Sequence, residues 1–152
     1  GQIFEAYDLM QSGDVVVIAT NGEQRSGLWG GLLSTAARAR GVHAVVTDGL
    51  VRDVREMNEM GFACFSRGYS PLDSAGRCLP TAVNVQIECG GVRIEPGDLI
   101  LADAEGVVVI PQSMSAEVLR RSLEKLEGEN TVRRELAAGD SPRTVFDRYG
   151  IL

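Results

Sequence analysis

Hydrophobic and polar positions form alternating blocks along the first half of the chain, and the blocks predict helices and strands in alternation. Apolar residues at helical spacing predict a helix over residues 2–11. Residues 15–19 and 42–47 are continuous apolar runs rich in β-branched side chains, which is typical of strands buried on both faces. Between them, residues 32–40 predict a helix that ends at Gly41.

The same pattern repeats once before it changes. Residues 51–60 predict a helix that ends at Gly61, and residues 62–66 predict a third strand. Residues 20–31 form a polar, glycine-rich loop of the kind that lines a pocket. This alternation implies right-handed crossovers and a largely parallel sheet.

A different pattern begins after residue 68. Residues 68–82 contain two prolines and two glycines and predict a loop. Four short apolar runs separated by turns then predict a meander of short strands. These predicted strands cover residues 83–87, 92–94, 99–102 and 107–110.

Helices are predicted for the remainder of the chain. Residues 113–138 predict a long helix in two parts, broken or kinked near Gly128, and a last short helix runs from Ser141 to Gly150. Without repeats or low-complexity segments, the pattern predicts a single α/β domain over residues 1–152. The first residues resemble the middle of a helix, so we expect a preceding N-terminal segment to be missing.

Composition narrows the function classes. The chain has 152 residues, of which 44% are hydrophobic and 24% charged, enough for a substantial core. A net charge of -6 argues against nucleic acid as a partner, although a local arginine still permits an acidic substrate. No apolar run is long enough for a membrane span, and no signal peptide is visible. Three cysteines without a C-x-x-C pair indicate free thiols and a cytoplasmic protein.

The leading candidates for chemistry are Arg52, Asp53 and Glu56. On a helix the two carboxylates share one face, and a pair of oxygen ligands completed by water suits Mg²⁺ or Mn²⁺. Arg52 is able to hold a carboxylate by a forked contact. The alternative is a solvated first helical turn, in which the acids favour the helix N-terminus and pair with Arg52 or Arg55.

Other motifs carry weaker signals. Gly30 and Gly31 precede a predicted helix and are able to present backbone N–H groups to a carboxylate, although a plain glycine turn fits equally. The preceding loop matches neither the P-loop nor the G-x-G-x-x-G pattern, so a nucleotide site is not favoured. His43 opens a strand, and no nucleophile elbow accompanies it. The acids of the long helix indicate a solvated face or a contact with a neighbouring subunit.

Several longer motifs resemble the RraA-like family, which includes regulators of ribonuclease activity and class II 4-hydroxy-4-methyl-2-oxoglutarate aldolases. They are W-G-G-L-L-S-T-A-A-R-A-R-G-V from residue 29, D-G-L-V-R-D-V-R-E from residue 48, and C-G-G-V-R-I-E-P-G-D-L-I-L-A-D-A-E-G-V-V-V-I-P from residue 89. G-D-V-V-V-I and V-F-D-R-Y-G-I-L extend the resemblance over nearly the whole chain.

The resemblance implies an α/β/β/α domain of the swivelling β/β/α type, assembled as a homotrimer or hexamer with active sites between subunits. It implies a divalent metal, Mg²⁺ or Mn²⁺, held largely through water. Asp53 matches the direct metal ligand of family aldolases, and Arg52 matches the arginine that contacts the 2-oxo acid. The loop from Trp29 through Gly30, Gly31, Leu32 and Leu33 would receive the substrate carboxylate on its backbone amides.

The sequence departs from the family pattern at residue 31. Aldolase members commonly carry an acid at the position of Gly31, and here the pattern reads Gly-x20-Arg-Asp-x2-Glu. Glu56 is therefore expected to substitute as a catalytic acid and a metal-site residue. A further acid is expected from the C-terminal helix of a neighbouring subunit, and Glu129 is favoured over Glu127 by position.

These features lead to a metal-dependent lyase that cleaves 4-hydroxy-2-oxo acids to pyruvate and also decarboxylates oxaloacetate. The alternative is a non-catalytic, ring-shaped regulator that binds a ribonuclease or helicase partner. Retention of Asp53 and Glu56 argues against it, because a pure binding protein has no need of that cluster. Methyl transfer to a quinone is discounted, because no glycine motif with a downstream acid for S-adenosylmethionine is present.

Overall fold

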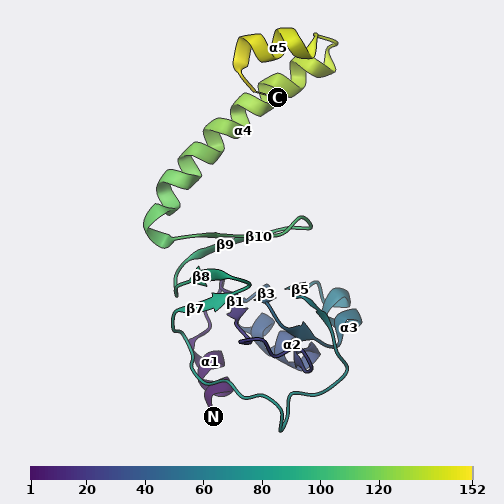
Figure 1. Ribbon diagram of the computed structural model, residues 1–152, viewed down its shortest axis with the longest axis vertical. Helices are drawn as coiled ribbons and strands as arrows, with labels where there is room; N and C mark the ends of the chain where they lie inside the picture. Colours follow the sequence, from purple (N-terminus) through teal and green to yellow (C-terminus); the bar gives the residue numbers. More distant parts are fainter. Residues whose placement is uncertain (152) are drawn as a thin grey trace. The chain divides into compact units, whose positions relative to one another are not determined.

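The computed structural model describes residues 1–151, and the chain divides into two compact units, Gly1–Val109 and Ile110–Leu152. The first unit holds the sheets and three helices, and the second is helical (Figure 1). As the sequence predicts, the fold is mixed α/β with parallel sheets and C-terminal helices. None of the helices in the described part of the chain is both long and apolar enough to span a membrane.

A three-stranded parallel sheet forms the centre of the first unit. Its order is β1 (Val15–Ile18), β3 (Ala44–Thr47) and β5 (Ala63–Phe65), with Val16 paired to Val45 and Val46 to Phe65. These are the apolar runs that the sequence predicts as strands, shortened by one or two residues. Their β-branched side chains suit a sheet that is covered on both faces.

The first unit contains a second three-stranded parallel sheet. Its strands are β2 (Gly27–Trp29), β4 (Leu50–Val51) and β6 (Gly68–Tyr69), in that order. Each of them follows one strand of the first sheet along the chain. The sequence interpretation missed this sheet, because strands of two or three residues are too short to show a hydrophobic period.

The core of the first unit gathers side chains from both sheets and from two helices. Ala37 on α2 (Gly31–Ala39) and Met57 on α3 (Val54–Glu59) pack with Trp29 and with neighbouring apolar residues. Trp29 stacks on Phe62 with ring centroids 6.1 Å apart, and on Tyr7 of α1 (Gln2–Leu9) at 6.5 Å. The remaining buried members of this core are Val42, Val45 and Val51.

The predicted helix over residues 51–60 is wrong at its start. Leu50 and Val51 belong to β4, and α3 begins at Val54. Between them Asp53 has a left-handed backbone, with φ +56°. Aspartate is among the few residues that adopt this conformation readily, so the turn from strand to helix is made at the candidate site itself.

The short-strand region is built from two pairs of strands. β7 (Ile87–Cys89) pairs antiparallel with β8 (Val92–Ile94), and β9 (Leu99–Ala102) pairs with β10 (Val107–Ile110). The predicted strand over residues 83–87 is wrong except for its last residue. Asn84 has φ +53°, which interrupts an extended chain at that point.

The second unit contains η1 (Gln112–Met114), α4 (Ser115–Ala137) and α5 (Pro142–Tyr149). Of the two predicted alternatives near Gly128, a break is wrong, because α4 runs through this residue. A Cβ at residue 128 would lie 2.8 Å from Cδ1 of Ile151, so the glycine permits close packing instead of ending the helix. α5 ends at Gly150, as predicted, in the left-handed conformation with φ +67°.

Candidate functional site

The candidate site is built on the glycine turn that opens α2. Gly30 is the N-cap of α2 and Gly31 is its first residue. A buried hydrogen-bond chain fixes this turn: the Trp29 indole N–H donates to Ser34 Oγ at 2.7 Å, and that hydroxyl donates to the Gly30 carbonyl at 3.0 Å. The turn is therefore rigid, with the N–H groups of the first helical turn at its open side.

The strand β4 delivers Arg52 and Asp53 to this turn. The backbone N–H of Arg52 donates to the Trp29 carbonyl at 2.8 Å. The Gly31 N–H donates to Oδ2 of Asp53 at 3.0 Å. The carboxylate of Asp53 thus lies at the N-terminus of α2, where a negative charge is stabilised by the helix dipole.

Glu56 reaches the same turn from the first turn of α3. A Cβ built on Gly31 would lie 2.2 Å from Oε2 of Glu56, and one built on Gly30 would lie 2.5 Å from Oδ2 of Asp53. Both carboxylates therefore occupy the space that side chains at these two positions would fill. Glu56 thus lies where a side chain at residue 31 would begin, and its role as a substitute for an acid at that position stays a prediction.

Arg52 lies between carboxylates. Its Nε is 3.7 Å from Oδ2 of Asp53, and its Nη2 is 3.6 Å from Oδ2 of Asp73. Nη1 donates to the Gly27 carbonyl. The side chain is only 24% exposed, so its orientation is well constrained while one edge stays open to solvent. Asp73 lies in a predicted loop, and no pattern in the sequence indicated that it would meet Arg52.

The donor set fits a hard divalent cation. Among residues 1–151 no group of three or more His, Cys, Asp or Glu side chains is arranged to hold a metal, so Asp53 and Glu56 offer oxygen ligands without a full protein cage. Mg²⁺ keeps several waters and is commonly bound through one or two carboxylates. Asp53 and Glu56 are thus the residues that would hold such an ion.

The remaining predicted residues have different surroundings. The Gly31 amide, expected to receive the substrate carboxylate, donates to Asp53. The amides of Leu32 and Leu33 belong to the same first turn of α2, which has no intrahelical acceptor for them. Glu129 lies on α4 of the second unit and pairs with Lys125 at 3.6 Å. Its contribution to a neighbouring subunit's site stays a prediction.

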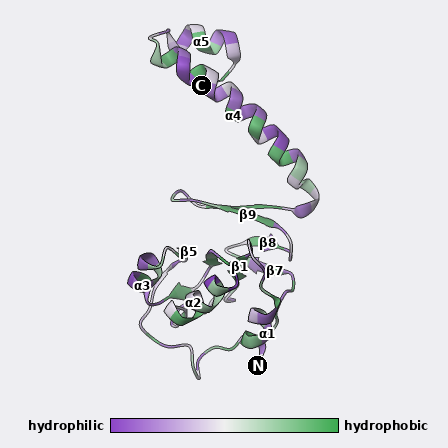
Figure 2. Cartoon of the chain, turned by 180° about the vertical axis from the view of Figure 1, so that it is seen from behind, coloured by the Kyte–Doolittle hydropathy of each residue, from purple (hydrophilic) through white to green (hydrophobic). Residues whose placement is uncertain are grey.

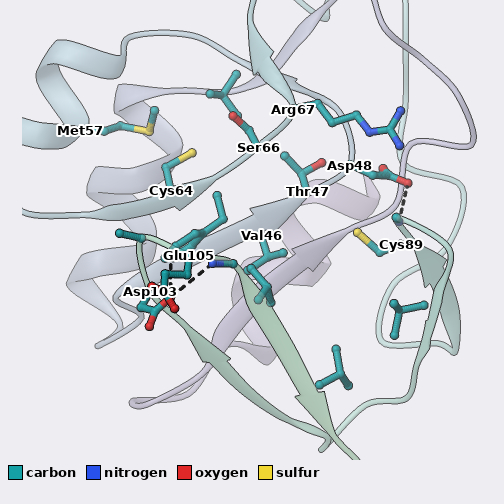
Figure 3. Close-up of a pocket in the computed structure, with 18 of the residues that line it drawn as sticks. Val46, Thr47, Asp48, Met57, Cys64, Ser66, Arg67, Cys89, Asp103 and Glu105 are labelled. Atoms are coloured by element: carbon teal, nitrogen blue, oxygen red, sulfur yellow. Dashed lines mark hydrogen bonds between the residues drawn. The ribbon is translucent and has the colours of Figure 1, made fainter.

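A cavity of about 660 Å³ in the first unit is distinct from this cluster. Val51 and Val54 line it, but Arg52, Asp53 and Glu56 do not. Figure 3 shows Thr47, Asp48 and Arg67 at one end of it and the Asp103–Glu105 turn at the other.

The three cysteines are free thiols, as predicted. Burial raises the pKa of the Cys64 thiol to about 11 and also raises the pKa of the Cys89 thiol. Both side chains line the cavity. At neutral pH both therefore stay protonated, which does not favour a nucleophilic role for either.

Several curated relatives are named as aldolases or putative aldolases. A "putative 4-hydroxy-4-methyl-2-oxoglutarate aldolase" of Halalkalibacterium halodurans is 36% identical over 129 residues, covering 85% of this chain and 60% of the relative. The "4-hydroxy-4-methyl-2-oxoglutarate aldolase" of Thermus thermophilus is 32% identical over 104 residues, covering 68% of this chain and 63% of the relative. The chain thus spans less than two thirds of the length of either.

A solved structure with the same fold carries a different description. It is Streptomyces coelicolor RraAS2, described as "an unusual member of the RNase ES inhibitor RraA protein family". The two superpose with a TM-score of 0.81 at 30% identity, covering 88% of this chain and 68% of that one. The RraA-like family model, described as Aldolase/RraA, matches residues 1–109. With the site geometry and these matches together, the chain belongs to the RraA-like family.

Proposed function

We propose that the protein is a divalent-metal-dependent lyase that cleaves 4-hydroxy-2-oxo acids to pyruvate by a retro-aldol reaction and decarboxylates oxaloacetate. The observation that carries the proposal is the convergence of Arg52, Asp53 and Glu56 on the glycine turn at the N-terminus of α2. The names of the aldolase relatives support the reaction class.

Both reactions break a carbon–carbon bond and leave negative charge on the enolate of pyruvate. A Mg²⁺ or Mn²⁺ ion bound by Asp53 and Glu56 would supply Lewis-acid stabilisation of that charge. Arg52, whose Nη1 donates to Gly27 and whose Nε and Nη2 lie near Asp53 and Asp73, would contact the 2-oxo acid through its guanidinium and would stabilise the enolate as it forms.

The substrate carboxylate would bind at the start of α2. The amides of Leu32 and Leu33 belong to the first turn of α2, and a helix N-terminus favours an anion. Glu56, next to Gly31, would orient the water that returns a proton to the enolate. Glu129 from a neighbouring subunit would complete this proton path.

Pyruvate release tests the proposal. The protein is incubated with oxaloacetate or 4-hydroxy-4-methyl-2-oxoglutarate and Mg²⁺, and pyruvate is followed with lactate dehydrogenase against a protein-free control. We expect turnover that stops on adding EDTA and returns with excess Mg²⁺. Arg52→Lys should lower kcat by about 10²-fold or more, the cost of losing an oriented donor to an oxyanion. Turnover that is indifferent to EDTA would contradict the metal-dependent mechanism.

A second candidate function is regulation of a ribonuclease or helicase partner. It is favoured by the description of RraAS2 as a member of a ribonuclease-inhibitor family. Under this reading the protein would bind the purified partner and lower its activity, and Asp53→Asn would leave that inhibition unchanged. Inhibition assays with the wild type and this variant, run beside the pyruvate assay, distinguish the two functions.

A further inference from the structure

Asp73 is held in a fixed orientation in the loop between β6 and β7. Its Oδ1 accepts a hydrogen bond from the Ala75 N–H at 2.5 Å, and its carbonyl accepts one from Nη1 of Arg77 at 2.8 Å. The second carboxylate oxygen, Oδ2, lies 3.6 Å from Nη2 of Arg52. One oxygen therefore fixes the turn while the other faces the arginine.

The residues just before Asp73 are tied to the strands of the site. The Ser70 N–H donates to the Val51 carbonyl, and the Gly27 N–H donates to the Leu72 carbonyl, each at 2.9 Å. Ser70 is buried, and its hydroxyl accepts from the Leu72 N–H at 3.2 Å. The backbone thus brings Asp73 to Arg52 from a segment that lies some twenty residues further along the sequence.

The charges around Arg52 have a consequence for ligand binding. The guanidinium faces Asp53 on Nε and Asp73 on Nη2, so a substrate oxygen that approaches Nη2 competes with Asp73. Asp73 is 57% exposed and Arg52 24%, so solvent screens their attraction and the competition is modest.

We propose that Asp73 is a positioning residue: it holds the Arg52 guanidinium in its working orientation and weakens the hold of Arg52 on the bound 2-oxo acid. The inference rests on the proposed function, in which Arg52 contacts the 2-oxo acid. Removing the charge of Asp73 would tighten the binding of the substrate in its ground state. It would also make the orientation of the Arg52 guanidinium that the reaction needs less well fixed.

Asp73→Asn tests this, because asparagine keeps an oxygen for the Ala75 N–H and removes only the charge. We expect KM for oxaloacetate and kcat each to fall by about threefold, the scale of a partly exposed ion pair, and oxalate in the presence of Mg²⁺ to bind about threefold more tightly. Loss of fold stability alone would not lower KM. Asp73→Glu should restore both constants toward wild type.

Asp8→Asn is the matched control, because it breaks another exposed pair, Asp8 with Arg40 at 3.1 Å, and should change neither constant. In an Arg52→Gln background, Asp73→Asn should have no effect. Unchanged KM, kcat and oxalate affinity in Asp73→Asn would overturn the inference. If the wild type turns over no substrate, the proposed function fails, and oxalate titration alone decides: tighter binding in Asp73→Asn supports the inference, and equal or absent binding overturns it.

Discussion

At the scale of single residues, the contact between Gly31 and Glu56 links the sequence to the proposed chemistry. Glu56 fills the space where a side chain at residue 31 would begin. A side chain at residue 31 would displace the flexible carboxylate end of Glu56, so we expect the two positions to be alternatives for a single carboxylate. An aspartate at the first position of a helix is also compatible with the helix dipole.

This relation predicts that the acid is transferable between the two positions. Glu56→Ala should lower kcat/KM for oxaloacetate by at least about tenfold, as expected for loss of a proton-transfer group. Adding Gly31→Asp to that variant should recover part of the loss, whereas Gly31→Asp alone should be impaired because its side chain meets Glu56.

Glu59→Gln serves as the control, since Glu59 is on α3 and pairs with Arg55 at 3.3 Å. If the folded double variant recovers no activity over Glu56→Ala, then Glu56 does not replace an acid at residue 31.

A second residue-scale prediction concerns the rigidity of the glycine turn. Ser34→Ala leaves the buried Trp29 indole N–H without its acceptor. We expect the free energy of unfolding to fall by about 1–3 kcal/mol, the cost of an unsatisfied buried donor. Urea unfolding followed by the fluorescence of Trp29 measures it. Thr35→Ala, which removes a neighbouring side-chain hydrogen bond to Gly31, is the comparison, and an equal cost in both variants would contradict the argument.

At the scale of elements, Asp48 joins the two sheets to the β7–β8 turn. Its carboxylate accepts from the Thr20 N–H at 2.8 Å, from the Thr20 hydroxyl at 2.9 Å and from the Gly90 N–H at 3.2 Å. Burial opposes its ionisation, but these hydrogen bonds outweigh burial and lower the pKa of Asp48 below its usual value.

The lowered pKa predicts a pH dependence of stability. In the unfolded chain an aspartate has a pKa of about 3.9. The contribution of Asp48 is therefore full above that pH and is lost as pH falls toward the lower folded-state pKa. Asp48→Asn should be less stable than wild type at pH 7, and the difference should shrink below about pH 4. A difference that is constant from pH 7 to pH 3, measured by urea unfolding, would contradict this assignment.

The elements also show where sequence reasoning succeeds. Runs such as Val15–Ile18 are long and β-branched enough to identify a buried strand, and glycines correctly end most helices. β2, β4 and β6 escaped prediction because pairing across the sheet, rather than local pattern, creates strands of two or three residues. The break predicted at Gly128 was wrong because helix propensity does not include the packing of Ile151 against this glycine.

The candidate site also contains residues that the sequence predicts and one that it does not. Spacing alone placed Arg52, Asp53 and Glu56 together, because they are near neighbours in sequence. Asp73 joins them only through backbone pairing between distant segments, so no local pattern reveals it.

At the scale of the whole molecule, apolar side chains remain uncovered in both units. Leu119, Leu123 and Leu126 recur along α4 and are each about half exposed or more, and hydrophobic positions recur along that helix in Figure 2. Leu99 and Leu101 of β9 are similarly exposed. Such apolar surfaces are typical of subunit interfaces, which accords with the predicted homotrimer or hexamer.

The assembly prediction is tested by sedimentation. We expect the wild type to sediment as a trimer or hexamer, and Leu123→Glu, which places a charge in the middle of the α4 leucines, to shift it toward the monomer. Arg121→Glu is a control on the same helix, because the Arg121 side chain is 74% exposed and its ion-pair partner is Glu117. A wild type that is monomeric at micromolar concentration would contradict the predicted assembly.

The most direct test of the central claim compares wild type and Asp53→Asn in one assay, the initial rate of pyruvate formation from oxaloacetate as Mg²⁺ is raised. Asparagine keeps an oxygen at the Gly31 amide and removes the charge that would hold the ion. The account predicts a saturating Mg²⁺ dependence in the wild type and a rate no greater than that of the protein-free control in Asp53→Asn. Equal rates in the two proteins would contradict it.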